Sequence, residues 1–209
     1  LMNNLHTGGR LSVSIDGEQA KKIINEGISI AAINNKNQRV FSGNEISMTL
    51  LMEELEKLGI SYVKLRTSHA FHSFMLDPVL DEFRNELKKI SFNKIHLKFI
   101  SNKTGKFITD KEAASIDYWV DHLRNTVLFS KGIETLISLN KKMTFIEVGA
   151  GNTLTNLIKN QIKDKDIWSI NLIRTEKEKV DDLYYFSTKI GYLWNLGVNI
   201  NWLAHYGNE

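Results

Sequence analysis

Cysteine is missing from this 209-residue sequence, and proline occurs once, at Pro78. Without cysteine the chain can form no disulfide, thiolate metal site or cysteine nucleophile. No apolar run approaches the length that crosses a bilayer, so we expect no membrane partner. The opening stretch LMNNLHTGGR also lacks the basic head and apolar centre of a signal peptide. We expect a cytoplasmic protein, because a reducing compartment is compatible with these absences.

The sequence also has no large excess of positive or negative charge. Lys and Arg total 27 against 24 for Asp and Glu, which gives a net charge of +3. Nucleic-acid binding needs clustered positive charge, so we expect no nucleic-acid partner. The apolar fraction of 42% is ordinary for a globular protein, and the length is sufficient for a real hydrophobic core.

The first third of the chain alternates strand and helix patterns. Strands are predicted at 10–15, 28–35, 38–43 and 60–66. One helix is predicted at 17–27, and a second begins at Asn44 and ends at Gly59. The apolar stripe of the second helix is predicted to include Ile46, Leu50, Leu51, Leu55 and Leu58. The resulting order, β-α-β-β-α-β, is typical of a ferredoxin-like unit.

The remaining two thirds mix both kinds of element. Helices are predicted at 78–90, 131–140, 152–163 and 178–196. Strands are predicted at 94–102, 144–151 and 168–173. The segment 197–209 is predicted to be a non-repeating tail. We interpret the aromatic residues near 118–129 and 184–202 as core or interface residues, because such spacing is more typical of packing than of ligand stacking.

The stretch SHAFHSFML, residues 68–76, places His69 and His72 three residues apart. Three readings are open: a metal pair, a catalytic base with a companion, and two solvated rings on a loop. A metal site needs further ligands, and His96 and His122 lie in other predicted elements, so we expect no metal. A loop histidine can take and return a proton near neutral pH, which keeps a catalytic role open.

The stretch EVGAGNTLT, residues 147–155, places a glycine turn between a strand and a helix. Such a turn can cradle an anion at the helix N-terminus. The stretch lacks the full dinucleotide fingerprint, and no P-loop lysine follows it. We favour the alternative that Gly149 and Gly151 permit a tight turn.

Several stretches occur together in an order that resembles a known family. They are GGRLSV, AAINNKNQRVFSG, SHAFHS, ISNKTG, DYWVDHLRNTVLF and FIEVGAGNTLTNLI. The set resembles the acyltransferase domain of modular type I polyketide synthases and is similar to malonyl-CoA:acyl-carrier-protein transacylases. The resemblance implies an α/β fold: a ferredoxin-like α+β small subdomain (8–67), the C-terminal part of an α/β-hydrolase-like large subdomain (68–177) and a linker (178–209).

The resemblance also implies a chemistry. The family uses a Ser-His dyad, in which His72 would be the base. The serine would take a malonyl group from malonyl-CoA and pass it to the phosphopantetheine of an acyl carrier protein, with no bound cofactor. His69, Ala70 and Phe71 would line the substrate site, and Phe71 would fill the space that an α-methyl group needs. The backbone carbonyl near His122 would orient the imidazole of His72.

The family's serine lies in a G-H-S-x-G stretch, which these 209 residues do not contain. The family's carboxylate-binding arginine and oxyanion-hole glutamine loop would precede Leu1. We therefore expect the C-terminal portion of the domain, inactive alone, with partners in the N-terminal half, the ketosynthase and other synthase domains, and the carrier protein. Two alternatives stay open: a non-catalytic remnant that serves as a docking or spacer module, and a separate chain that supplies the missing half.

Overall fold

The computed structural model describes residues 5–139, 142–162 and 166–207. The chain forms two compact units, Leu1–Leu139 and Asn140–Glu209. The three segments predicted from the sequence divide the chain at other positions, since the segment 68–177 includes residues of both units, and their boundaries at residues 67 and 177 stay predictions. Within the described residues, no helix combines the length and the apolar character that a membrane crossing requires.

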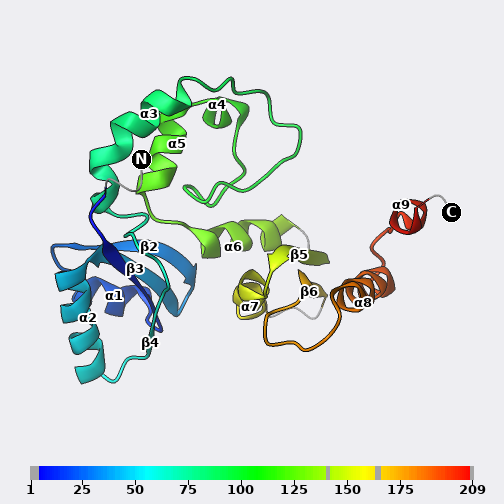
Figure 1. Ribbon diagram of the computed structural model, residues 1–209, viewed down its shortest axis with the longest axis horizontal. Coiled ribbons are helices and arrows are strands. Elements are labelled where there is room, and N and C mark those ends of the chain that lie inside the picture. The colour runs from blue at the N-terminus through cyan, green and yellow to red at the C-terminus, as the bar shows by residue number, and fades with distance from the viewer. Residues whose placement is uncertain (1–4, 140–141, 163–165, 208–209) are drawn as a thin grey trace. The chain divides into compact units, whose positions relative to one another are not determined.

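The first unit begins with a four-stranded sheet (Figure 1). Its elements are β1 (Gly8–Val13), α1 (Gly17–Ile23), β2 (Ile28–Asn35), β3 (Gln38–Asn44), α2 (Glu45–Lys57) and β4 (Tyr62–Lys64). The strand order is β2-β3-β1-β4, and all neighbours are antiparallel. This order confirms the predicted ferredoxin-like unit. The last strand is shorter than the predicted 60–66, because ladder pairing with β1 ends at Lys64.

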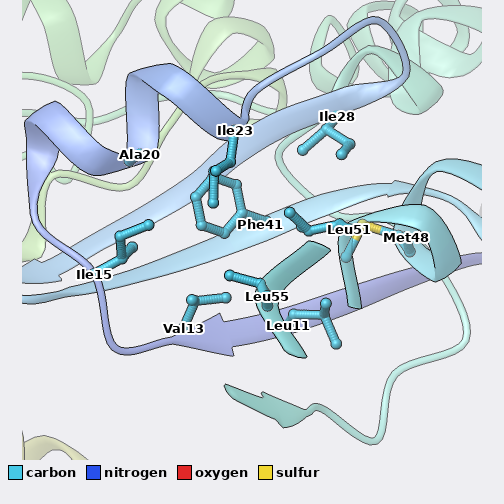
Figure 2. Close-up of a cluster of buried hydrophobic side chains, with 10 residues drawn as sticks. All are labelled: Leu11, Val13, Ile15, Ala20, Ile23, Ile28, Phe41, Met48, Leu51 and Leu55. Atoms are coloured by element: carbon cyan, nitrogen blue, oxygen red, sulfur yellow. The ribbon is translucent and has the colours of Figure 1, made fainter. Parts of the chain in front are cut away.

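Both helices of this sheet begin at a capping side chain. Asp16 forms a capping box with Gln19 at the start of α1, and the Asn44 side chain accepts a hydrogen bond from the Ser47 N–H at the start of α2. The two helices share one core with the strands, which Figure 2 shows as a single cluster. The cluster comprises Leu11, Val13, Ile15, Ala20, Ile23, Ile28, Phe41, Met48, Leu51 and Leu55.

The predicted apolar stripe of α2 was partly wrong. Leu51 and Leu55 are fully buried, but Ile46, Leu50 and Leu58 are 76%, 53% and 56% exposed. Met48 takes the third core position. The helix carries apolar residues on more than one face, and the positions that contact the sheet are 48, 51 and 55, spaced three and four residues apart.

A distant segment covers the free edge of β2. The Val127 N–H donates to the Ala31 carbonyl and the Ile33 N–H donates to the Val127 carbonyl, both at 2.9 Å. The Thr126 hydroxyl donates to the Ile30 carbonyl at 2.6 Å. Paired backbone groups at an edge close it to other chains, and here they also attach the following segment to the sheet.

The rest of the first unit is helical. Its elements are the 3₁₀ helix η2 (Phe74–Val79), then α3 (Leu80–Leu87), α4 (Asp110–Ala113), α5 (Ile116–Arg124) and α6 (Phe129–Leu139). The helix predicted at 78–90 therefore starts earlier, as a 3₁₀ turn that contains Pro78, and its α-helical part ends at Leu87. The predicted helix 131–140 is confirmed up to Leu139, and its last residue lies outside the described residues.

The strand predicted at 94–102 is wrong. Only an isolated bridge between Ile100 and Phe107 forms there, and Leu97 is 82% exposed. Side chains fix this segment in place of a ladder: the Tyr118 hydroxyl donates to Ser101 Oγ at 2.6 Å. That oxygen also accepts the backbone N–H groups of Lys103 and Thr104. Alternation of apolar residues predicted a strand, but no neighbouring strand lies beside it among the described residues.

The second unit is a parallel strand pair with helices. Its elements are β5 (Met143–Ala150), α7 (Thr153–Lys159), β6 (Ile167–Ile173), α8 (Asp182–Asn195) and α9 (Trp202–Tyr206). The predicted strands 144–151 and 168–173 are confirmed, and they pair in parallel. The predicted helix 152–163 ends at Lys159, and its last residue lies outside the described residues. The segment 197–209 is not purely irregular, since it contains α9.

Candidate functional site

His72 lies in the loop between β4 and η2, in an unusual backbone conformation. Its φ is +60°, and it is the one non-glycine residue with positive φ in the part of the chain that the structure describes. This left-handed conformation costs a side-chain-bearing residue about 1–2 kcal/mol. Ser73 offsets the cost, because its buried hydroxyl donates to the Ala70 carbonyl at 2.5 Å and accepts the Met75 N–H at 3.2 Å. The turn therefore fixes the direction of the imidazole.

The same loop lies directly against β1. Ala70 is 1% exposed. A Cβ atom added to Gly8 would lie 2.8 Å from the Ala70 Cβ and 3.1 Å from the Met75 sulfur. The Gly8 N–H also donates to the Ser68 carbonyl at 3.2 Å. Glycine at this position lets the loop approach the strand closely.

His72 meets His122 of α5 in a group of aromatic rings. The two imidazole centroids are 6.1 Å apart, with their planes at 89°. The Tyr118 and Trp119 rings lie 6.3 Å and 6.0 Å from His122. Tyr118 is buried and Trp119 is half-buried, so these rings shield the pair from water on that side. The structure therefore brings together two of the residues singled out in the sequence.

Burial and neighbouring charges favour the neutral form of the His72 imidazole. Burial lowers the pKa of His72, and the Arg10 guanidinium and His122 lower it further. Backbone groups of Asn125 and His122 oppose this shift without reversing it, while Nδ1 of His72 is buried and has no partner at hydrogen-bond geometry. Burial also lowers the pKa of His122. A neutral imidazole near neutral pH is the form that accepts a proton.

His69 and Phe71, two further predicted site residues of this loop, lie close together. The rings of His69 and Phe71 are 6.2 Å apart and tilted by 57°. The Ser68 hydroxyl lies 2.8 Å from Nδ1 of His69. His69 is therefore held within its own loop, while His72 contacts α5.

Arg10 was not singled out in the sequence. It lies on β1, its side chain makes no ion pair among the described residues, and its Nε is buried without a partner. Burial lowers the pKa of the guanidinium. The strand pattern offered one signal: β1 places Leu11 and Val13 in the core, so Arg10 had to occupy the opposite face.

A carboxylate of the same chain occupies the N–H groups at the glycine turn after β5. The Glu147 carboxylate accepts the N–H groups of Leu154 and Thr155 at 3.0 and 2.8 Å. These are the donors that a bound phosphate would use. Gly151 has a φ of +96°, which supports the tight-turn interpretation over the anion cradle.

The first unit is thus a ferredoxin-like sheet whose loop presents a half-buried histidine with a lowered pKa to a neighbouring helix. The acyl transferase domain family matches residues 1–199. The chain belongs to this family, and the resemblance predicted from the sequence is confirmed.

Known proteins of polyketide synthesis resemble the chain over its full length. It is 29% identical to a type I phenolphthiocerol synthesis polyketide synthase (Pks15/1) of Mycobacterium marinum, over 100% of this chain and 10% of that protein. The structure of the acyl transferase domain of ZmaA has a TM-score of 0.87 and 30% identity, over 100% of this chain and 49% of that one. This agreement confirms the mixed α/β fold.

The structure of a transacylase also resembles the chain. The malonyl CoA-acyl carrier protein transacylase of Clostridium perfringens has a TM-score of 0.77 and 29% identity, over 92% of this chain and 59% of that one. The chain spans about a tenth of the Mycobacterium marinum relative and less than two thirds of either structural relative.

Proposed function

We propose that this chain is part of a polyketide synthase acyltransferase domain that moves a malonyl unit from malonyl-CoA to an acyl carrier protein, with His72 as the general base. One observation carries the proposal. The imidazole of His72 is half-buried, has a lowered pKa and is held by a strained turn beside His122. Strained backbone and shifted pKa values together are typical of catalytic groups.

The reaction needs one group that first accepts a proton and then donates it. His72 takes the proton of a serine hydroxyl as the serine oxygen attacks the thioester carbonyl of malonyl-CoA. The imidazolium then gives that proton to the leaving coenzyme A thiolate, which leaves a malonyl-serine ester. In the second half, His72 deprotonates the phosphopantetheine thiol of the carrier protein, and the thiolate sulfur attacks the carbonyl of the malonyl-serine ester. The ester bond to serine breaks, and the imidazolium gives its proton to the departing serine oxygen.

The loop residues before the base supply the substrate site in this proposal. Ala70 is buried against β1, which fixes the distance between the loop and this strand. The rings of Phe71 and His69 lie 6.2 Å apart. The proposal assigns to Phe71 the space that an α-methyl group would need. A methyl group in an apolar pocket is worth about 1–3 kcal/mol, which is sufficient for a preference for malonyl over methylmalonyl.

The orienting group in this proposal is the backbone of α5 and the residues after it. Backbone groups of His122 and Asn125 lie near the His72 ring and act on its pKa. A carbonyl that accepts the N–H of one ring nitrogen leaves the other nitrogen free to accept a proton. The proposal therefore assigns to the backbone of His122 the orienting role that the family resemblance implied.

The proposal requires a serine from outside this sequence. The 209 residues contain no G-H-S-x-G stretch. The nucleophile and the remainder of the domain would come from another segment of the same cytoplasmic synthase, whose ketosynthase and carrier protein are the expected partners. A base without its nucleophile cannot form the acyl-enzyme, so we expect the isolated chain to be inactive.

Intact mass spectrometry after incubation with malonyl-CoA tests this function. The samples are this chain and a longer polypeptide that also carries the family's serine segment, each as wild type, His72→Gln and His96→Gln. We expect the malonyl adduct on the longer form only, and its formation at least about 100-fold slower in His72→Gln, because general-base catalysis contributes about 10²–10⁴. His96 is exposed, so its variant is the control for loss of an imidazole. An adduct on the isolated chain would contradict the proposal, and no adduct on either form would favour the docking-module alternative.

A further inference from the structure

A buried hydrogen bond joins α5 to the turn at residues 101–106. The Tyr118 hydroxyl donates to Ser101 Oγ at 2.6 Å, and the two residues are only 5% and 1% exposed. A phenylalanine at position 118 would fill the same apolar space without burying a hydroxyl, so packing alone does not require this bond. A buried hydrogen bond adds little net stability, but it fixes the direction of the groups that form it. The bond therefore specifies the orientation of the Tyr118 ring.

The turn at residues 101–106 is a firm support for this ring. The Ser101 N–H donates to the Lys106 carbonyl at 2.8 Å, and the Gly105 N–H donates to the Ser101 carbonyl at 2.7 Å. The Gly105 carbonyl also accepts the Thr135 hydroxyl of α6 at 2.5 Å. Because the turn is bonded within itself and to α6, the position of Ser101 is fixed.

Helix geometry relates the orientation of Tyr118 to that of His122. The two residues lie four positions apart in α5, so their side chains are on the same face, one turn apart. Their ring centroids are 6.3 Å apart, with 27° between the planes. The Trp119 ring lies 6.0 Å from His122, and its Nε1 donates to the Ala113 carbonyl at 2.9 Å. His122 therefore packs against two rings, each of which is held by a hydrogen bond.

The His122 ring in turn packs against His72. The two centroids are 6.1 Å apart with the planes at 89°, so one ring presents its edge to the face of the other. Backbone groups of His122 and Asn125 also act on the pKa of His72. A movement of His122 would therefore change both the burial and the surroundings of the His72 imidazole. A continuous series of contacts leads from Ser101 through Tyr118 and His122 to the candidate base.

We propose that Tyr118 is a positioning residue: anchored by Ser101, its ring holds His122 against the His72 imidazole and so fixes the direction in which His72 accepts a proton. Tyr118 acts through His122, and the buried hydroxyl is what makes its ring a fixed support. That the proton comes from a serine rests on the proposed function, whereas the series of contacts does not.

NMR titration of the histidine rings in this chain tests the inference without any catalysis. Tyr118→Phe removes the hydroxyl and keeps the ring, so the fold should persist while the ring loses its anchor. We expect the pKa of His72 to rise towards its usual value of about 6.5, because burial, the largest cause of its lowering, decreases. Tyr184→Phe is the matched control, since Tyr184 is 67% exposed on α8. An unchanged His72 titration in Tyr118→Phe, or an equal change in Tyr184→Phe, would overturn the proposal.

The loss of this hydroxyl changes no charge around His72. Arg10 of β1 and His122 of α5 are the charged and titratable groups that act on its imidazole. Asp77 of η2 is paired with Arg124 of α5. A phenol carries no charge in the pH range where histidine titrates, so a shifted titration reports the packing of the imidazole.

Ser101→Ala tests the same bond from its other end. This variant removes the acceptor and leaves Tyr118 in place. If the two residues act through their bond, the double variant should shift the pKa of His72 no further than Ser101→Ala alone. Addition of the two single shifts would show that the residues act separately and would overturn the anchoring by Ser101.

Kinetics of the longer polypeptide with the serine segment separate positioning from stability. We expect Tyr118→Phe to lower kcat about tenfold and to leave KM for malonyl-CoA within about twofold, because a misdirected base slows the chemical step without weakening substrate binding. A loss of stability with wild-type kcat and wild-type His72 titration would mean that Tyr118 supports only the fold, which overturns the proposal. A shifted titration in a polypeptide that forms no malonyl adduct would confirm that Tyr118 positions His72 and would remove the proposed function.

Discussion

The imidazole rings of His72 and His122 lie 6.1 Å apart, edge to face, with their planes at 89°. One ring comes from the loop after β4 and the other from α5, so the contact joins the ferredoxin-like sheet to the helical part of the same unit. Two imidazolium ions at this separation repel each other, which disfavours the doubly protonated pair, and burial lowers the pKa of each ring as well. The arrangement thus ties the protonation of a candidate base to the packing of the unit.

Stability should fall in mild acid because of this pair. Both histidines have pKa values below their usual range of about 6.5. Between the lowered folded pKa and about 6.5 the unfolded chain binds more protons than the folded one, so stability rises with pH in that window. Full stability is present above about pH 6.5 and is lost as pH falls through the folded pKa values. Urea unfolding at several pH values from about 5 to 7.5 measures the slope.

Glutamine variants test whether His72 and His122 cause this dependence of stability on pH. His72→Gln and His122→Gln should each flatten the pH dependence, because a glutamine does not titrate. His96→Gln should leave it unchanged, since His96 is exposed on another segment. A slope as steep in the double variant as in the wild type would show that other groups cause the acid loss.

Shortening Phe71 should relax the choice of acyl group. The rings of Phe71 and His69 lie 6.2 Å apart. If the proposed function holds, removal of the Phe71 ring opens the space that an α-methyl group would fill. In the longer polypeptide with the serine segment, Phe71→Ala should raise the rate with methylmalonyl-CoA relative to malonyl-CoA about tenfold or more. Competition between the two substrates, read by the mass of the adduct, gives the ratio. Phe71→Leu keeps most of the volume and should change the ratio little; an unchanged ratio in Phe71→Ala would remove this residue from the specificity site.

Adding a methyl group to Gly8 should push the candidate loop away. The new Cβ would lie 2.8 Å from both the Ala70 Cβ and the Gly43 carbonyl oxygen, and backbone oxygen cannot move cheaply. We expect Gly8→Ala to lower the free energy of unfolding by about 1–3 kcal/mol, the usual cost of overpacking. Gly9→Ala is the matched control, because its Cβ would meet Met48 at an ordinary 3.4 Å. Denaturant unfolding in which both variants behave alike would mean that the loop does not lie against β1.

Sequence periodicity predicted the ferredoxin-like unit because its signals are local. Caps at Asp16 and Asn44 and alternation in the strands need no distant partner to be read. The segment 94–102 failed for the opposite reason. Its alternation is that of a strand, but strand formation depends on a neighbour, and here Ser101 and Tyr118 hold the chain instead. The pairing of Val127 with the edge of β2 could not be predicted from local patterns either, since it joins residues about a hundred positions apart.

The candidate site was predictable only where a motif marked it. SHAFHS drew attention to His72, and the family resemblance added His122. Arg10 lies in no motif that marks a charge near His72, and only the fold reveals that its guanidinium lowers the pKa of His72. The strained φ of His72 could not be predicted either, because the hydrogen bond from the Ser73 hydroxyl to the Ala70 carbonyl maintains it.

Glu147 offers a test of the second unit. Its carboxylate accepts two N–H groups at the start of α7, so Glu147→Gln removes a charge that favours the positive end of the helix and weakens two hydrogen bonds. We expect a loss of about 1–2 kcal/mol in local stability, the usual cost of a lost N-terminal cap. Hydrogen exchange of the Leu154 and Thr155 amides measures it directly, and both should exchange faster. Glu176→Gln is the control, because Glu176 is exposed and loses the same charge. If phosphate then slowed exchange in Glu147→Gln but not in the wild type, the carboxylate would be confirmed as the group that keeps anions out of this turn; unchanged exchange in Glu147→Gln would mean that it caps nothing.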